Sequence, residues 1–379
     1  MMHKLTRNFS RTIHTLVGRE HAGTGMMANN TLTVTLFGAT GSLGRYVSEK
    51  LAMLGARVYI PFRGCESDVR HLRVPYDLGR LGLIPFSPRD HDSVKFALER
   101  SDVVVNMIGK TYETKHMVPT RRRNGKLSRV NYSFEEVHVD IPQRLAEWSK
   151  EAGVERFIHV GALGSDPTSP SQWSRTKFEG EQAVKNAFFH SSIVRPAMMF
   201  GPYDRFLTKI PSFQTRPLIP FVPLVNGGVN TMQPVFAVDV AEAIVRLIQQ
   251  EDVWESTGTF NLAGPEKYTL REVYELVWDI TMMNPKTYNV PLEVVRLMGK
   301  IMELYPDPFI TEDEMIHWSE DCYIHEDELE AEGARTFKDL GMTPASLESE
   351  AFHFLNRYRT GGHFIRVEGY HGEVFQKDH

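Results

Sequence analysis

The chain has 379 residues, of which 41% are hydrophobic and 24% are charged, and its formal net charge is −5. This composition is ordinary for a globular protein and gives no overall attraction to nucleic acid, so no nucleic-acid partner is expected. The two cysteines, Cys65 and Cys322, form no Cys-x-x-Cys pair, which supports neither a disulfide framework nor a cysteine zinc site. No metal site is expected. No apolar run reaches the ~18 residues that a membrane-spanning helix needs.

Residues 1–30 differ in composition from the rest of the chain. Residues 1–19 contain basic but no acidic side chains, and their apolar residues recur at helical spacing. Such a composition is typical of a mitochondrial transit peptide, and the lack of a long apolar core counts against a secretory signal. A disordered basic tail is the alternative. We therefore expect residues 1–30 to be a transit or disordered segment of a mitochondrial protein.

The clearest motif is the glycine-rich segment 38–44, which reads Gly-Ala-Thr-Gly-Ser-Leu-Gly. It follows the apolar run 32–37 and opens an amphipathic stretch, which is the strand-turn-helix context of a dinucleotide-binding site. The first glycine makes the tight turn, the second lets the backbone approach a pyrophosphate, and the third lets the helix pack closely. The pyrophosphate would rest on free N–H groups at the helix start. We assign to cofactor binding Gly38, Thr40, Gly41, Ser42, Leu43 and Gly44.

Strand and helix patterns alternate beyond this turn. Strands are expected over 58–60, 83–86, 103–108, 157–160 and 192–194, and helices over 43–54, 134–152 and 173–189. Gly153 follows the second of these helices in the position of a C-cap. The alternation predicts an α/β fold with a doubly wound parallel sheet of the Rossmann type.

The pattern loosens after residue 205, where a smaller C-terminal lobe is expected. Four prolines interrupt an apolar stretch there, which should therefore not be helical: Pro211, Pro217, Pro220 and Pro223. Later elements are expected as strands over 235–240 and 259–262 and a helix over 270–280.

We divide the chain accordingly into a Rossmann domain at 31–205 and a mixed lobe and tail at 206–379. Strands and helices of the second part are expected to return to the Rossmann core. The polar tail 357–379 either packs on a partner or is a frayed terminus.

The residues that follow the later strands indicate which cofactor binds. An NAD site places a carboxylate after the second strand, whereas an NADP site places an arginine there for the 2′-phosphate. This chain has Arg63 at that point, so one tightly bound NADP(H) is expected, with an ordinary surface charge as the alternative role. Asp90 is expected to accept a hydrogen bond from the adenine amino group, and Gly109 to leave room for the ribose. Ile108 and Pro196, at two further strand ends, complete the expected cofactor site.

These residues make the chain resemble the extended and atypical short-chain dehydrogenase/reductase superfamily. Within it, the chain is similar to the NADP(H)-binding accessory subunits of mitochondrial NADH:ubiquinone oxidoreductase, complex I, over residues 30–365. Segments 195–196 and 238–241 contribute to the resemblance to the superfamily, and the closer resemblance is carried by segments 59–63, 108–115, 150–160 and 200–207. The resemblance implies a subunit that holds NADPH on the matrix side of the inner membrane, near the junction of the two arms. The implied partners are other complex I subunits, and the implied role is in assembly or stability.

The position of the superfamily's proton donor is altered in this chain. Its hydride chemistry requires a tyrosine whose pKa is lowered by a lysine one helical turn later. Trp173 and Lys177 occupy those places, and an indole N–H cannot pass a proton. No catalytic residue is therefore assigned. Lys177 is expected to hydrogen-bond the nicotinamide ribose or else to be a helix-surface lysine, and His159 is expected to be a core residue.

The segment 115–129 is rich in basic residues, contains no acidic residue, and is an apparent insertion relative to that family. It is either a solvated loop or a surface for anionic lipid headgroups or an acidic partner.

Three functions remain open at this point. The favoured one is a non-catalytic, NADP(H)-holding accessory subunit of complex I. The others are an active NADP-dependent reductase or epimerase that uses a donor such as Tyr112, and a free-standing redox-nucleotide sensor.

Overall fold

The computed structural model describes residues 32–113, 120–121, 127–128, 132–215, 222–250, 252–283, 287–303, 308–325, 327, 329 and 332–359. Its centre is a seven-stranded sheet with the order β13-β8-β7-β4-β1-β2-β3, in which all neighbours are parallel. The strands are β1 Thr33–Phe37, β2 Arg57–Phe62, β3 Leu81–Pro85, β4 Val103–Asn106, β7 Arg156–Val160, β8 Ser191–Pro196 and β13 Gly258–Leu262. The expected doubly wound parallel sheet is confirmed.

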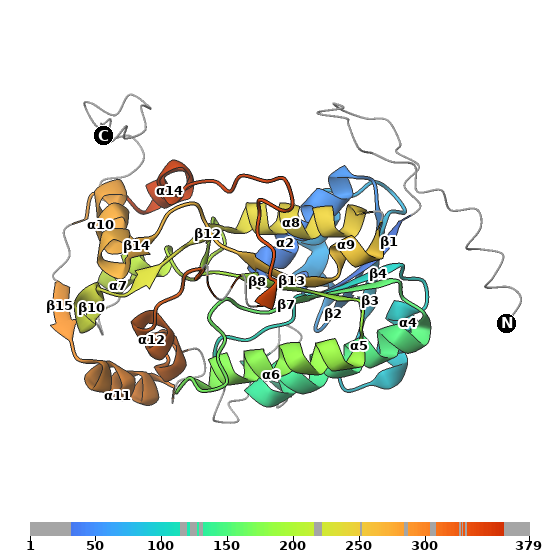
Figure 1. Ribbon diagram of the computed structural model, residues 1–379, viewed down its shortest axis with the longest axis horizontal. Coiled ribbons are helices and arrows are strands. Elements are labelled where there is room, and N and C mark those ends of the chain that lie inside the picture. Colours follow the sequence, from blue (N-terminus) through green and yellow to red (C-terminus); the bar gives the residue numbers. More distant parts are fainter. Residues whose placement is uncertain are drawn as a thin grey trace, which may run out of the picture.

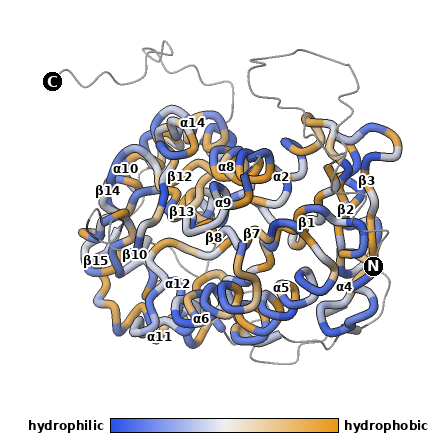
Figure 2. Tube along the Cα trace, turned by 45° about the vertical axis from the view of Figure 1, so that its right-hand side comes forward, coloured by the Kyte–Doolittle hydropathy of each residue, from blue (hydrophilic) through white to orange (hydrophobic). Residues whose placement is uncertain are grey.

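Helices cover both faces of this sheet (Figure 1). One layer contains α2 (Ser42–Met53) and α8 (Ala237–Gln249), and the other contains α4 (His91–Leu98), α5 (Ile141–Ala152) and α6 (Gln172–Ala187). A separate cluster of buried apolar side chains lies under each layer. Blue and orange residues alternate along α5 and α6 in Figure 2, as expected for helices with one face in water. The two layers therefore bury the sheet on both sides, which explains why its strands read as apolar runs.

The central strands show this double burial directly. Every residue of β1 and of β4 is buried. Their β-branched side chains fit a pleated surface that has no solvent face. At the end of α5, Gly153 adopts a left-handed conformation with φ 74°, which confirms the expected C-cap.

Most of the remaining elements build a lobe at the end of the molecule where Figure 1 labels β10 and α11. Its helices are α7 (Lys209–Thr215), α10 (Leu270–Thr281), α11 (Leu292–Met302), α12 (Glu312–Ser319) and α14 (Leu347–Leu355), whereas the short helix α9 (Val253–Ser256) lies beside α8 (Figure 1). Its short strands are β9 (Met199–Phe200), β10 (Val222–Val225), β11 (Thr231–Met232), β12 (Val235–Phe236), β14 (Tyr268–Thr269) and β15 (Thr287–Val290). A third apolar cluster, which includes Tyr274 and Trp318, forms the interior of the lobe.

Two expectations for this part of the chain are wrong. Pro211 lies inside α7 rather than in an irregular segment, because it occupies the first turn, where a helix needs no N–H donor. The expected strand over 235–240 is only the two-residue β12, after which α8 begins at Ala237. The apolar residues of α8 recur at helical spacing over its whole length, and this longer pattern determines the structure.

Several expectations fall on residues outside the described part. They include the transit segment 1–30, most of the basic segment 115–129 and the tail beyond 359. Within the basic segment, β5 (Thr120–Arg121) and β6 (Leu127–Ser128) pair in antiparallel fashion. The C-terminal half supplies β13 to the main sheet, and the domain boundary at residue 205 stays a prediction.

Candidate functional site

The glycine turn lies at the point where the strand order of the sheet reverses. β1 pairs with β2 on one side and with β4 on the other, so a crevice opens at the carboxyl ends of β1 and β4. Gly38 turns the chain with φ 83°, and a Cβ there would lie 2.7 Å from the carbonyl carbon of Met107. A Cβ on Gly44 would lie 2.5 Å from the Cα of Ala39, whereas one on Gly41 would meet only a carbonyl oxygen at 3.3 Å. The fold therefore requires the first and third glycines, and Gly41 leaves space for something outside the fold.

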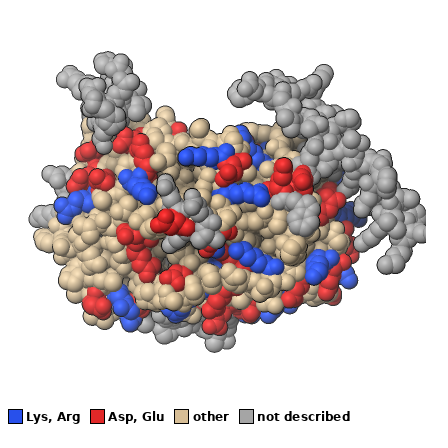
Figure 3. All heavy atoms as spheres, viewed as in Figure 1, with Lys and Arg blue, Asp and Glu red and all other residues tan. Residues whose placement is uncertain are grey.

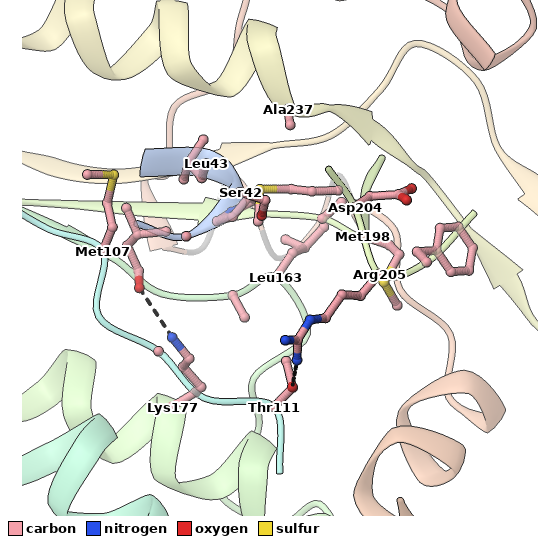
Figure 4. Close-up of a pocket in the computed structure, with 18 of the residues that line it drawn as sticks. Ser42, Leu43, Met107, Thr111, Leu163, Lys177, Met198, Asp204, Arg205 and Ala237 are labelled. Carbon is pink, nitrogen blue, oxygen red and sulfur yellow. Dashed lines mark hydrogen bonds between the residues drawn. The ribbon is translucent and has the colours of Figure 1, made fainter. Parts of the chain in front are cut away.

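A cavity of about 350 Å³ begins at this turn and extends to α12 (Figure 4). Eight of the predicted cofactor residues line it: Gly38, Gly41, Ser42, Leu43, Gly44, Gly109, Lys177 and Pro196. Four others do not line it. Thr40 is exposed at the turn, and Ile108 packs against the apolar cluster beneath α4 and α5. Arg63 and Asp90 are exposed beyond the cavity, at the carboxyl ends of β2 and β3.

Lys177 is buried on α6 and is not a helix-surface lysine. Its Nζ donates a hydrogen bond to the carbonyl oxygen of Val160 at 3.4 Å, and the side chain extends toward the turn from the opposite wall (Figure 4). Burial lowers the pKa of Lys177 to about 8. The ammonium is also 3.5 Å from the place where a Cβ on Gly109 would lie, so the absence of a side chain at Gly109 keeps this wall open.

Trp173 lines the cavity one helical turn before Lys177. Its Nε1–H donates a hydrogen bond to the carbonyl oxygen of Lys110 at 3.0 Å, and its ring packs against His317 with centroids 5.2 Å apart. The only polar hydrogen of the indole is therefore engaged with the backbone of the loop that follows β4. The side chain at the proton-donor position fastens this loop to α6.

Two buried histidines support the same wall. His138 lies in a π-helical turn, Glu136–Asp140, where its Nδ1 is 2.9 Å from the Thr176 hydroxyl and its Nε2 is 3.3 Å from the Lys110 backbone nitrogen. Burial lowers the pKa of His138 well below its usual value. The expectation that His159 is a core residue agrees with its place, because its Nδ1 is 3.2 Å from the Asn106 side-chain nitrogen and burial lowers its pKa to about 3.

Sequence reasoning missed the far end of the cavity. Residues of α12 and of the chain after β8 line it: Met198, Arg205, Phe206, Asp313, Glu314, His317 and Trp318. Burial lowers the pKa of His317 to about 4, and Arg205 donates a hydrogen bond to the Thr111 hydroxyl at 3.3 Å (Figure 4). Asp313 caps the start of α6 by accepting from the Ser171 hydroxyl at 2.8 Å. No local motif marks the residues of α12, because the lobe brings them to Trp173 from more than a hundred positions away.

The fold is shared with solved structures of known enzymes. The sequence model of the NAD dependent epimerase/dehydratase family matches residues 34–263. An NADPH-dependent quinone oxidoreductase from Escherichia coli, solved with NADPH, superposes with a TM-score of 0.61 at 15% identity over 85% of this chain and all of that one. A nucleoside-diphosphate-sugar epimerase from Staphylococcus aureus gives 0.60 at 17% identity over 86% of this chain and all of that one. At these identities the superpositions show the fold alone.

Proteins much more similar in sequence come from mitochondria. The NADH dehydrogenase [ubiquinone] 1 alpha subcomplex subunit 9 of Mus musculus is 36% identical, over 90% of this chain and 84% of the mouse protein. The Arabidopsis thaliana protein of the same name is 36% identical, over 87% and 79%. The NADH-ubiquinone oxidoreductase 40 kDa subunit of Neurospora crassa is 35% identical, over 88% and 81%. The chain belongs to the alpha subcomplex subunit 9 family.

Membership of the alpha subcomplex subunit 9 family accounts for more of the chain than the epimerase model does. That model ends at residue 263, before α12, whereas the alignment with the mouse subunit 9 extends over 342 residues. The lobe end of the cavity, with His317 and Trp318, lies beyond the epimerase match. The predicted resemblance to accessory subunits of complex I is confirmed at the level of the family.

Proposed function

We propose that this protein is a non-catalytic accessory subunit of mitochondrial complex I that holds one NADP(H) molecule. The relatives that share most of its length carry the names of complex I subunits, which supports the assignment to that complex. The observation that carries the non-catalytic part is Trp173, which occupies the proton-donor position and donates its only polar hydrogen to Lys110. Tyr112, the alternative donor, does not line the cavity, which weakens the hypothesis of an active reductase.

The residues of the cavity fit a dinucleotide. The open face at Gly41 suits a pyrophosphate, and Ser42 and Leu43 at the start of α2 present backbone N–H groups to it. Lys177 would hold the ribose next to the nicotinamide, beside Gly109 and Pro196. Thr40, Asp90, Ile108 and Arg63 complete the proposed set, and Arg63 selects the 2′-phosphate of NADP(H). The bound nicotinamide would supply a hydride, but the place of the superfamily's tyrosine proton donor at that end is taken by Trp173, whose indole N–H cannot pass a proton.

The expected consequence of cofactor binding is stability of the subunit and of its assembly. A ligand that binds only the native state stabilises it by about 2.7 kcal/mol when present at 100 times its dissociation constant. We place the subunit on the matrix side of the inner membrane, attached through its partners and through anionic lipid. Among the helices that the structure describes, none has the length and apolar character to cross a membrane.

The assignment can be tested on the native assembly. Mitochondria that express the tagged full chain are solubilised gently, and the assembly is sized by native electrophoresis and its nucleotide extracted and identified. We expect migration with complex I and NADP(H) in a one-to-one ratio. Migration as a free monomer would contradict the accessory role and favour the redox-sensor alternative.

The cofactor choice has a separate test. Arg63→Asp places a carboxylate where the 2′-phosphate would lie, so retention of NADPH should fall and retention of NADH should rise. Recovery of NAD(H) from the wild-type complex, or unchanged NADPH retention in Arg63→Asp, would show that Arg63 does not select the cofactor.

A further inference from the structure

Two arginines lie at neighbouring strand ends beyond the glycine turn. Arg63 follows β2 and Arg89 follows β3, and these strands are parallel neighbours, so both residues stand at the carboxyl edge of the sheet. Both guanidinium groups lie over one aromatic ring, that of Tyr132, at 5.0 Å from its centroid for Arg63 and 4.6 Å for Arg89. A ring face attracts a guanidinium and limits its freedom. The two cations are thus gathered at one point.

Tyr132 is itself held by the wall of the cavity. Its carbonyl oxygen accepts a hydrogen bond from Lys110 Nζ at 2.9 Å, and the carbonyl oxygen of Lys110 accepts the bond from Trp173. Nearby, the backbone nitrogen of Phe134 donates to the carboxylate of Glu113. Tyr132 is therefore fixed from the cavity side, where the chain returns after the basic segment.

The charges around the ring do not balance. Glu136 accepts two hydrogen bonds from Arg89, at 2.5 and 2.6 Å, and this pairing lowers the pKa of Glu136. Arg63 makes no ion pair with any carboxylate of the described residues. One guanidinium is thus oriented by a carboxylate, and the other lies beside it without a counter-charge in the described part. Such a pair suits a dianionic group that can accept from both.

We propose that Arg63 and Arg89 together form the binding site for the adenosine 2′-phosphate and that Tyr132 is the positioning residue that holds both. The inference rests on the proposed binding of NADP(H) and adds Arg89 and Tyr132 to the arginine that follows the second strand. Arg63 supplies the charge after β2, Arg89 supplies a second donor from the next strand, and the Tyr132 ring keeps them together. The ligand class is a nucleotide phosphorylated at the 2′ position of its ribose.

The test compares two soluble probes on the purified full chain by calorimetry. Adenosine 2′,5′-diphosphate carries the 2′-phosphate, and ADP lacks it. Removing one charge-assisted hydrogen bond should weaken the first probe about 10-fold in Arg89→Met, with little change for ADP. Tyr132→Leu should weaken the first probe in the same selective way, and Tyr132→Phe, which keeps the ring, should restore it.

Two controls keep the outcomes distinct. Arg57→Met removes an exposed cation at the opposite end of β2 and should change neither affinity, which separates a site effect from net charge. Arg89→Met with Glu136→Gln removes the carboxylate that the single variant leaves without its partner, and it should show the same selective loss.

The proposal is overturned if Arg63→Met loses the 2′-phosphate preference while Arg89→Met and Tyr132→Leu keep it. In that case the proposed function stands and Arg63 acts alone. If the wild-type chain itself shows no preference for the 2′-phosphate, the proposed binding of NADP(H) fails as well.

Discussion

The two ends of the cavity differ in how the chain builds them. The glycine end is built around one continuous stretch, 38–44, whose spacing determines the turn, the open face and the helix start. The lobe end is made by α12 and the chain after β8, which meet only in the folded protein. The glycine end has a sequence signature because a short turn restricts which residue can stand at each of its positions. The lobe end has none, because many different side chains can close a lobe.

The two ends also differ in charge. On the face shown in Figure 3, basic and acidic side chains are interspersed, so no single-sign field covers it. Inside the cavity, the glycine end offers backbone N–H groups and Lys177, which suit an anion. The lobe end contains the carboxylates Asp313 and Glu314, of which the first caps α6 and the second pairs with Lys209, together with Arg205, which donates to the Thr111 hydroxyl. This difference supports the glycine end as the place of the proposed pyrophosphate.

The largest expected effect distinguishes the glycine that leaves space for a ligand, Gly41, from the glycine that the fold requires, Gly44. Gly41→Val places methyl groups where the pyrophosphate would lie, so NADPH affinity should fall by about 100-fold, the equivalent of two lost charge-assisted hydrogen bonds. The fold should survive, because the added Cβ meets only one protein atom within 4 Å. Fluorescence titration of NADPH and thermal unfolding without nucleotide measure the two effects.

Gly44→Ala is the contrasting variant. Its Cβ would overlap backbone atoms of Gly38 and Ala39, so it should destabilise the fold by about 1–3 kcal/mol, as overpacking does. If Gly41→Val binds NADPH as the wild type does, the glycine end does not hold the cofactor. If Gly41→Val instead forms a stable complex I without nucleotide, the bound cofactor has no structural role.

The second expected effect concerns the loss of stability in acid that His317, at the lobe end, should cause. Burial lowers the pKa of His317 to about 4, whereas the unfolded chain takes up that proton near pH 6.5. Between these values the unfolded state binds more protons than the folded state does. The free energy of unfolding should therefore fall by about 1.4 kcal/mol for this site with each unit by which the pH is lowered. Above pH 6.5 the contribution should vanish. His317→Phe should make the acid slope shallower in urea titrations at pH 7.5 and pH 5.

A matched histidine on the sheet side sharpens the comparison. His159 is buried on β7 of the main sheet, where burial lowers its pKa to about 3, so its contribution to the acid slope should persist to lower pH. If His317→Phe leaves the slope between pH 6.5 and 4 unchanged, the lobe end is open to water in solution and does not form a closed wall.

The sequence predicts the sheet far better than the lobe for a physical reason. β1, β4 and β7 are buried on both faces, and that environment favours runs that are mostly apolar, although β7 also holds the buried polar residues Arg156 and His159. After residue 205, Pro211 fits a helix because of its place in the first turn, and the strand expected over 235–240 is replaced after two residues by α8, whose apolar residues recur at helical spacing. The contacts of Trp173 with Lys110 and His317 depend on three distant segments. The sequence therefore could not predict that Trp173 holds the loop after β4 against α6, although it could predict that Trp173 cannot donate a proton.

The third expected effect tests the hydrogen bond by which Trp173 holds the loop after β4 against α6. Trp173→Phe keeps the ring beside His317 and removes the hydrogen bond to Lys110, so the protein should lose about 1 kcal/mol of stability. Complex I activity should stay close to that of the wild type. Neither form of the isolated chain should oxidise NADPH with a carbonyl or sugar-nucleotide substrate. Substrate-dependent turnover by the wild type would contradict the non-catalytic assignment and revive the reductase hypothesis.

The smallest expected effect concerns the basic segment 115–129, which joins the cavity wall at Glu113 and Tyr132 and lies mostly outside the described residues. We propose that its charges add attachment to anionic lipid, at about 1 kcal/mol or less per basic side chain, since salt screens exposed charges. Neutralising Arg121, Arg122 and Arg123 together should lower retention on vesicles that contain phosphatidylserine, most clearly at low salt. Retention on neutral phosphatidylcholine vesicles serves as the control and should not change. Because this segment ends where Tyr132 meets the two arginines, the triple variant should leave NADPH affinity intact if lipid is its ligand. Equal vesicle retention at every ionic strength would instead identify the segment as a solvated insertion, and lipid attachment would then have to reside elsewhere in the chain.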